Sequence, residues 1–212
     1  EVLAYHPINY GWVIGELVRR IDGRSFDQFL AQELTGPLGM GDFYVGLPSN
    51  LEDRVSKMHL MEADADVYGY VDIFNRPQVH GSIVPGACGI ASAGDLARFY
   101  AMMERKGALD GTRIFGEGTV KEATSLRVEG VDASLGLFAQ RSFGLALGDE
   151  RMGKPSEDPI NSFGHGGAGT SIGWADFDSG LAVGYITNGY RASETNNPRL
   201  AAISQAIRDA CI

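Results

Sequence analysis

The residues best suited to chemistry lie at positions 163–169, Phe-Gly-His-Gly-Gly-Ala-Gly, where one histidine stands among flexible glycines. A histidine can gain or lose a proton near neutral pH, and glycines let a ligand come close to the backbone. Two apolar runs, 170–176 and 181–187, flank the turn 178–180 (Asp-Ser-Gly), which is typical of a β-hairpin. The sequence therefore predicts a site around His165 beside this hairpin, with Tyr5 and His6 near the start of the chain as candidate partners.

An amphipathic helix is expected soon after Tyr5. Gly11 and Gly15 lie four residues apart on it, and each costs up to about 1 kcal/mol relative to alanine. Such a pair predicts a close contact with another helix or a wall that faces the substrate. Gly23 is typical of a helix end. The apolar face, at helical spacing, consists of Tyr10, Val13, Ile14, Leu17, Val18 and Ile21.

Three further helices are predicted from the residue types at their ends. Residues 25–28 (Ser-Phe-Asp-Gln) and 92–95 (Ser-Ala-Gly-Asp) have the spacing of a capping box. Asn197 and Pro198 are typical of the N-cap and first position of a closing helix that packs on the hairpin. The expected apolar faces are Phe26, Phe29, Leu30 and Leu34, then Leu96, Phe99, Tyr100 and Met103, and last Leu200, Ile203, Ile207, Ala210 and Cys211.

The order of these elements indicates the fold class. Helices come first, then antiparallel strands with a short apolar run at 143–147, then a closing helix. This order favours an α+β fold, an antiparallel sheet with flanking helices, over alternating βαβ units. Residues 71–84 show no periodicity that supports an element. Because no repeat or linker is found, we expect a single domain over residues 1–212.

Composition and charge restrict the partners. A chain of 212 residues with 44% hydrophobic and 21% charged residues can bury a sizeable core. A net charge of -9 would repel the phosphates of nucleic acid or an anionic membrane, so a small neutral molecule is the expected partner. No apolar run reaches the length of a membrane span. With no signal peptide recognised, we expect a cytoplasmic protein.

The cysteines and histidines show no metal-binding pattern. Cys88 and Cys211 are far apart and are expected as reduced core thiols, although one disulfide is left open. No cysteine or carboxylate joins the histidines at ligand spacing, so no metal site is expected. The four histidines are His6, His59, His80 and His165.

An alternative chemistry centres on Ser171. Residues 169–173, Gly-Thr-Ser-Ile-Gly, match the G-x-S-x-G pattern of an α/β-hydrolase nucleophile. That nucleophile needs a strand before it and a helix after it, whereas Ser171 leads into the predicted hairpin. With 29 glycines in the chain, chance matches to this pattern are expected. Ser171 is thus either a second candidate nucleophile or an ordinary strand serine.

Five segments in a fixed order resemble the serine β-lactamase-like family. The most similar branch is the class C-related carboxylesterases called family VIII, and the resemblance spans nearly all of the chain. It implies the serine β-lactamase/DD-peptidase-like fold and a hydrolase that forms an acyl-enzyme through a serine in an S-x-x-K motif. The segments are 5–12 (YHPINYGW), 15–25 (GELVRRIDGRS), 37–40 (PLGM), 89–98 (GIASAGDLAR) and 163–167 (FGHGG).

The resemblance also implies roles for particular residues. Tyr5 matches the family tyrosine, a phenol whose pKa of about 10 is lowered by a cationic neighbour so that it can exchange a proton with the serine. His165 would shape the pocket and polarise the acyl group. Gly166 and Gly167 would let the strand approach the substrate, and the backbone N–H of Ala168 would donate to the oxyanion. No cofactor is implied.

The S-x-x-K motif is missing from these 212 residues, because no serine stands three positions before any lysine. The chain therefore resembles the C-terminal part of such an enzyme, with the N-terminal part absent, and is expected to be inactive alone. Such a part would have an exposed sheet edge, an apolar groove beside Tyr5 and a tendency to self-associate. The lysines are Lys57, Lys106, Lys121 and Lys154.

The expected substrate is a small ester. Pro7 stands where many β-lactamases have an asparagine, and it has no side-chain amide to hold a β-lactam. Two alternatives remain open: a non-catalytic penicillin-recognising homologue that binds ligands, and a β-lactamase or DD-peptidase.

Overall fold

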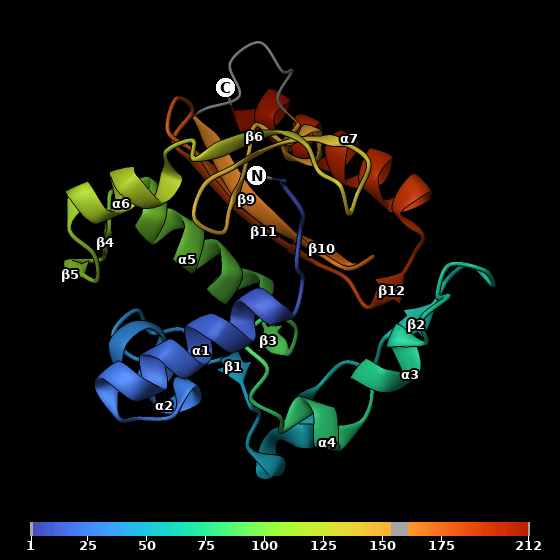
Figure 1. Ribbon diagram of the computed structural model, residues 1–212, viewed down its shortest axis with the longest axis horizontal. Helices are drawn as coiled ribbons and strands as arrows, with labels where there is room; N and C mark the ends of the chain where they lie inside the picture. The colour runs from blue at the N-terminus through green and yellow to red at the C-terminus, as the bar shows by residue number, and fades with distance from the viewer. Residues whose placement is uncertain (1, 154–160, 212) are drawn as a thin grey trace.

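The computed structural model describes residues 2–153 and 161–211, and its centre is a six-stranded antiparallel sheet (Figure 1). The strands lie side by side in chain order, each paired with its sequence neighbours. The predicted hairpin is confirmed, since its two strands pair over their full length. The strands are β6 (Val128–Val131), β7 (Phe138–Arg141), β8 (Ala146–Leu147), β9 (Ser162–Gly167), β10 (Ser171–Asp176) and β11 (Leu181–Ile186).

Helices and three small strand pairs surround this sheet (Figure 1). The helices are α1 (Asn9–Asp22), α2 (Phe26–Leu30) with a following π-helical turn (Ala31–Thr35), α3 (Tyr70–Phe74), α4 (Pro77–His80), α5 (Ala93–Glu104), α6 (Glu117–Thr124) and α7 (Ser193–Cys211), with 3-10 turns at Ser49–Arg54 and Glu150–Met152. The paired short strands are β1 (Phe43–Val45) with β3 (Gly89–Ala91), β2 (His59–Leu60) with β12 (Gly189–Tyr190), and β4 (Ala108–Leu109) with β5 (Thr112–Arg113). The α+β prediction is confirmed.

Each face of β10 packs on a different helix, because successive side chains of a strand point to opposite faces. Ala175 joins the hydrophobic cluster that contains Tyr100 of α5. Ile172 and Trp174 join the cluster that contains Leu200 of α7. Figure 1 shows α5 and α7 on either side of the sheet. This packing fixes β9 and β10 between two helices.

The predicted first helix forms as α1 and ends at Gly23, whose φ is 88°. Its apolar face points outward, however, and Val13, Leu17 and Ile21 are 66%, 50% and 78% exposed. Hydrophobic periodicity predicted the helix correctly, but it could not predict which element, if any, would pack on its apolar face. Apart from Tyr10, whose hydroxyl donates to Phe143 O at 2.5 Å, this face of α1 is a largely exposed apolar surface within the described residues.

The opposite side of α1 carries the predicted close contact. A Cβ added to Gly11 would lie 2.6 Å from the Cα of Gly86, and one added to Gly15 would lie 2.9 Å from the Cγ of Pro85. Real Cβ atoms essentially never come so close, so both positions require glycine unless the neighbours move. The contact is therefore made with the turn at 85–86 rather than with a helix.

Helix starts show where local patterns succeed. At α5 the N–H of Asp95 donates to the Oγ of Ser92 at 3.1 Å, so that capping prediction is confirmed. At α2 the helix follows Ser25 as predicted, but the serine side chain makes no capping hydrogen bond. The start of a helix can be satisfied by other partners, so the residue pattern alone did not determine the side-chain geometry.

The predicted start of the last helix is wrong. Helix α7 begins at Ser193, and Pro198 lies inside it. Glu62, from a distant segment, accepts hydrogen bonds from Thr195 Oγ1 at 2.7 Å and from the backbone N–H of Ala192 at 3.4 Å. A carboxylate at a helix N-terminus is stabilising, so this distant contact places the start earlier than the local Asn-Pro signal.

The buried face of α7 is also more polar than predicted. Its buried residues recur every four positions, while Ala210 and Cys211 are exposed. Cys88 is a buried free thiol, as expected, but Cys211 is not in the core. Hydrophobicity missed this face because Ser204 and Arg208 find hydrogen-bond partners on β10, in Trp174 and Asp176. The buried residues are Asn196, Leu200, Ser204 and Arg208.

No helix among the described residues is long and apolar enough to cross a membrane.

Candidate active site

The two candidate residues at opposite ends of the chain meet. The Tyr5 hydroxyl lies 3.3 Å from Nε2 of His165, although 160 positions separate the two residues. Tyr5 comes from the extended segment before α1, and His165 comes from β9. On β10 the residue paired with His165 is Gly173, and the space where a side chain of Gly173 would lie is filled by Tyr100 of α5. The sheet and α1 thus bring together the two residues best suited to proton transfer.

The hydrogen bonds of His165 fix which ring nitrogen carries the proton. Nδ1 lies 2.7 Å from the carbonyl oxygen of Gly166, which can only accept. Nδ1–H is therefore the donor, and in a neutral imidazole Nε2 is then the acceptor. Burial lowers the pKa of His165 below its ordinary value, and Arg141 and Arg151 also lower it. At neutral pH the Tyr5 hydroxyl thus donates to Nε2 of an uncharged His165.

Asp132 holds the backbone of Tyr5 in place. Its Oδ1 accepts from the N–H of Tyr5 at 3.1 Å, and also from the N–H groups of Ser134 and Leu135. The side chain is fully buried. A second link follows, where Leu3 O accepts from the N–H of Ala133 at 2.8 Å. The loop after β6 therefore clamps the segment that carries the phenol.

Sequence reasoning missed Asp132. The available signal was an aspartate followed by Ala-Ser-Leu-Gly, which is typical of a turn in which the carboxylate accepts from following backbone N–H groups. Nothing local indicated that the same oxygen would also accept from a residue 127 positions away.

Two guanidinium groups lie near the Tyr5–His165 pair. The Cζ of Arg141 lies 5.6 Å from the centre of the Tyr5 ring. Arg151 forms a two-bond ion pair with Asp149, at 2.8 Å and 2.5 Å. Neither arginine was identified from the sequence, because their separate positions in the chain gave no pattern.

The expected lowering of the Tyr5 pKa is wrong for the described residues. Burial raises the pKa of Tyr5 above its ordinary value of 10.0, and attraction to Arg141 and Arg151 offsets only part of that effect. A phenolate pays for lost hydration, and this cost exceeds the stabilisation by the two cations. Tyr5 is thus a neutral hydrogen-bond donor at physiological pH.

The glycines after His165 have distinct surroundings. A Cβ on Gly166 would lie 2.6 Å from Nη1 of Arg151, and one on Gly167 would overlap the Oγ of Ser171. A larger residue at either position would therefore displace the Arg151 or Ser171 side chain. Ala168 is exposed in the turn that follows β9. The structure thus places Gly166, Gly167 and Ala168 in a row from the His165 ring towards solvent.

Ser171 lacks the surroundings of an α/β-hydrolase nucleophile. It is half-buried at the first position of β10, between a tight turn and a β-hairpin. A nucleophile elbow requires a helix directly after the serine. The α/β-hydrolase alternative is therefore wrong, and Ser171 is a strand serine.

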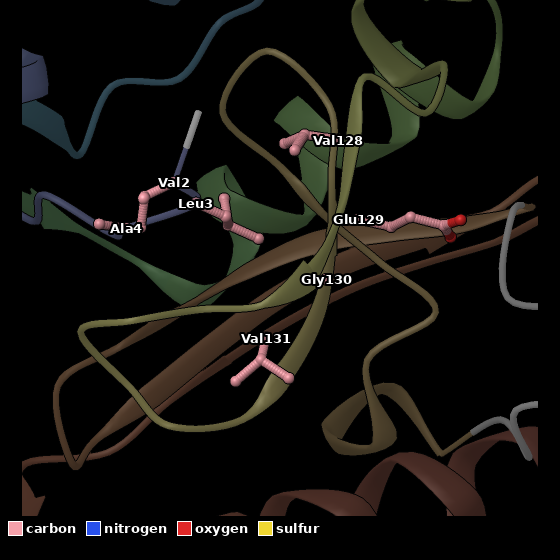
Figure 2. Close-up of a pocket in the computed structure, with 7 residues that line it drawn as sticks. All are labelled: Val2, Leu3, Ala4, Val128, Glu129, Gly130 and Val131. Atoms are coloured by element: carbon pink, nitrogen blue, oxygen red, sulfur yellow. The ribbon is translucent and has the colours of Figure 1, made fainter.

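A groove lies beside the Tyr5 segment, as Figure 2 shows. Its volume is about 540 Å³, and its walls come from two segments far apart in sequence, Val2–Ala4 and β6. Most of its lining is aliphatic, with Glu129 as the charged member. Strand β6 is at one edge of the main sheet and β11 at the other, within the described residues. The groove therefore runs along an edge strand and leads to the residue before Tyr5.

The fold is that of serine β-lactamases and penicillin-binding proteins. An antiparallel sheet between helices carries a histidine on one strand, and a tyrosine before the first helix reaches it. The beta-lactamase family model matches residues 1–206, and the chain belongs to this family.

Individual relatives agree with this assignment. The chain is 27% identical to the esterase/beta-lactamase LipL of Mycobacterium tuberculosis (strain ATCC 25618 / H37Rv), covering 87% of this chain and 48% of that protein. It matches the crystal structure of a family VIII carboxylesterase with a TM-score of 0.84 at 28% identity, covering 100% of this chain and 59% of that one.

A penicillin-binding protein homologue from Caulobacter crescentus matches with a TM-score of 0.79 at 27% identity, covering 98% of this chain and 59% of that one. The chain thus spans between 48% and 59% of the length of these three relatives.

Proposed function

We propose that this chain carries the tyrosine and histidine motifs of a serine esterase, which hydrolyses small esters through an acyl-enzyme. The contact between the Tyr5 hydroxyl and Nε2 of His165 is the observation that supports this most strongly. The nucleophilic serine and its lysine would come from residues outside the 212 considered, because no S-x-x-K motif occurs among them. The chain alone is then inactive.

The geometry suggests how the proton moves. Tyr5 takes the proton of the serine hydroxyl while its own proton passes to the free Nε2 of His165. The serine oxygen forms the new bond to the ester carbonyl carbon. When the alkoxide leaves, the proton returns through Tyr5 to the leaving oxygen. This relay avoids a free phenolate, which the raised pKa of Tyr5 disfavours. Water then repeats the sequence to release the acid.

The strand end after His165 suits an oxyanion site. We propose that the backbone N–H of Ala168 donates to the developing negative charge, with the N–H of the serine as the second donor. Gly166 and Gly167 carry no side chain, which allows the substrate to approach the backbone. A backbone donor needs no reorganisation during the reaction, and this is the usual advantage of such a site.

The choice of esters over lactams rests on Pro7 and on the relatives. Pro7 offers no side-chain amide to bind a lactam. Two of the matched relatives carry esterase or carboxylesterase in their names.

A fluorophosphonate probe tests the proposal, because it labels activated serines. The probe would be applied to the 212-residue chain and to the protein with its upstream residues restored, and the adduct located by peptide mass spectrometry. We expect labelling of an upstream serine only. Hydrolysis of p-nitrophenyl butyrate by the restored protein should fall at least about 100-fold in Tyr5→Phe, as for loss of a general base. Labelling or turnover by the chain alone would contradict the proposal.

A second candidate is a homologue that binds penicillin-like ligands without turnover. The raised pKa of Tyr5 favours it, since a neutral phenol can bind a ligand but is a poor base. Retention of fluorescent penicillin by the restored protein, without ester hydrolysis, would support this candidate over the esterase.

A further inference from the structure

Arg141 occupies a special position at the end of β7. It is half-buried and pairs with Val128 on one side and Ala146 on the other. Its guanidinium lies 5.6 Å from the centre of the Tyr5 ring. The charge is also close enough to His165 to affect the pKa of the imidazole. Arg141 thus lies beside both residues of the proposed site.

No carboxylate is paired with Arg141 among the described residues, and its guanidinium makes no hydrogen bond there. The charge of Arg141 reaches two nearby carboxylates, but both make their hydrogen bonds elsewhere, because Asp149 pairs with Arg151 and Asp132 binds backbone N–H groups. Among the described residues, the guanidinium groups of Arg76 and Arg105 also have no hydrogen-bond acceptor, but both side chains are exposed.

This lack of a partner is unusual for two reasons. The chain has 27 acidic and 18 basic side chains, so carboxylates are abundant. A half-buried guanidinium has also lost part of its hydration, and its fork of five N–H donors matches a carboxylate geometrically. An arginine left unpaired beside a reactive site is therefore well placed for an anionic group brought by a ligand.

We infer that Arg141 binds a carboxylate of the substrate, and that the preferred substrates are small esters which carry one free carboxylate, such as half-esters of short dicarboxylic acids. The inference rests on the proposed esterase function for the reacting end of the ligand. The cation–π contact with Tyr5 holds the guanidinium towards the phenol without using its N–H donors. The carboxylate would then neutralise the charge of Arg141 while the ester carbonyl lies at Tyr5 and His165.

Ligand binding to the 212-residue chain gives a direct test. Monomethyl glutarate, which is charged, would be compared by calorimetric or NMR titration with dimethyl glutarate, which is nearly the same shape but neutral. We expect the half-ester to bind at least about 10-fold more tightly, and added salt to reduce the difference. Arg141→Gln should remove the preference, and Arg141→Lys should retain part of it.

Arg127→Gln is the matched control. Arg127 adjoins β6 next to Arg141, and its Cζ lies 4.4 Å from the centre of an aromatic ring, that of Phe143. It is exposed and pairs with Glu122. The control should keep the preference of the wild type. Near-UV circular dichroism of each variant establishes that it is folded, so that a lost preference reports on the guanidinium.

The outcomes separate this inference from the proposed function. The inference is overturned if neither monomethyl glutarate nor acetoxyacetate binds more tightly than its neutral ester, or if the preference is unchanged in folded Arg141→Gln. A carboxylate on the alcohol side is tested with acetoxyacetate, and a preference for it over its methyl ester, lost in Arg141→Gln, would also support the inference. Failure of the esterase proposal is detected separately, by the absence of a labelled serine and of turnover in the restored protein.

Discussion

The buried ion pair between Asp176 and Arg208 gives a sharp stability prediction. Arg208 Nη1 lies 2.5 Å from Oδ2 of Asp176, and the two side chains are 7% and 1% exposed. Arg208 also donates from Nε to Met152 O at 2.8 Å, and its Cζ lies 4.4 Å from the centre of the Trp174 ring. The pair joins α7 to β10 across the cluster that supports β9.

Replacing Asp176 by asparagine leaves a buried guanidinium without its counter-charge. Removing one partner of a buried pair costs about 3–5 kcal/mol, and no discount for solvent screening applies at this depth. For a chain of this size each kcal/mol lowers Tm by about 2–4 °C, so the expected fall is roughly 6–20 °C. Arg208→Met should cost a similar amount, because the buried carboxylate then loses its guanidinium counter-charge.

Urea unfolding followed by circular dichroism measures both variants and the double variant Asp176→Asn/Arg208→Met. The double variant should lower the free energy of unfolding by clearly less than the two single variants together, because it leaves neither charge buried without its partner. Glu16→Gln is the control, because Glu16 forms the same kind of ion pair with Arg19 but is exposed, and no measurable change is expected there. An Asp176→Asn cost under about 1 kcal/mol at an unchanged m-value would refute the reasoning.

Three further predictions concern the sheet, the histidine and the exposed helix. Gly164→Ala should lower the free energy of unfolding by about 1–3 kcal/mol in urea, because its Cβ would lie 2.6 Å from that of Trp174, whereas Gly118→Ala, with open space around it, should not destabilise. Burial lowers the pKa of His165, so the unfolded chain binds a proton more readily. Stability from this residue is then fully present above about pH 6.5 and is lost as the pH falls below that value. The Tm of His165→Gln should therefore depend less on pH between 5 and 7, and parallel curves would contradict this. The chain alone should self-associate through the exposed face of α1, and Leu17→Lys should weaken that association in sedimentation velocity. A compact wild-type monomer at all concentrations would be the contrary result.

Much of the fold could be predicted from local patterns. The hairpin of β10 and β11, the extent of α1 and the cap of α5 each depend on residues close together in sequence. The signals were the turn residues of the hairpin, the side-chain periodicity of α1 and the serine three positions before the N–H that it caps in α5. Each acts over a few residues, and the structure confirms all three elements. The predicted start of α7 was wrong, because Glu62 from a distant loop binds the N-terminus of this helix.

The candidate site was predicted in part. Tyr5 and His165 were chosen from residue type and family resemblance, and the structure brings them to 3.3 Å. Asp132 and Arg141 could not be chosen, because their importance depends on which segments lie side by side after folding. Within the described residues the pKa of Tyr5 is raised rather than lowered, because the degree of burial is a property of the folded chain.

The sequence by itself determined which residues could do chemistry and which segments form helices and strands, since those depend on side-chain type and on spacing within a few positions. Tertiary structure decided which faces are buried and which groups meet. The apolar face of α1 lies outward, while Ser204 and Arg208 of α7 lie inward. The phenol, the imidazole and the unpaired guanidinium come together from three segments. Burial and distance arise only when the chain is packed, and they set the charge state of each group.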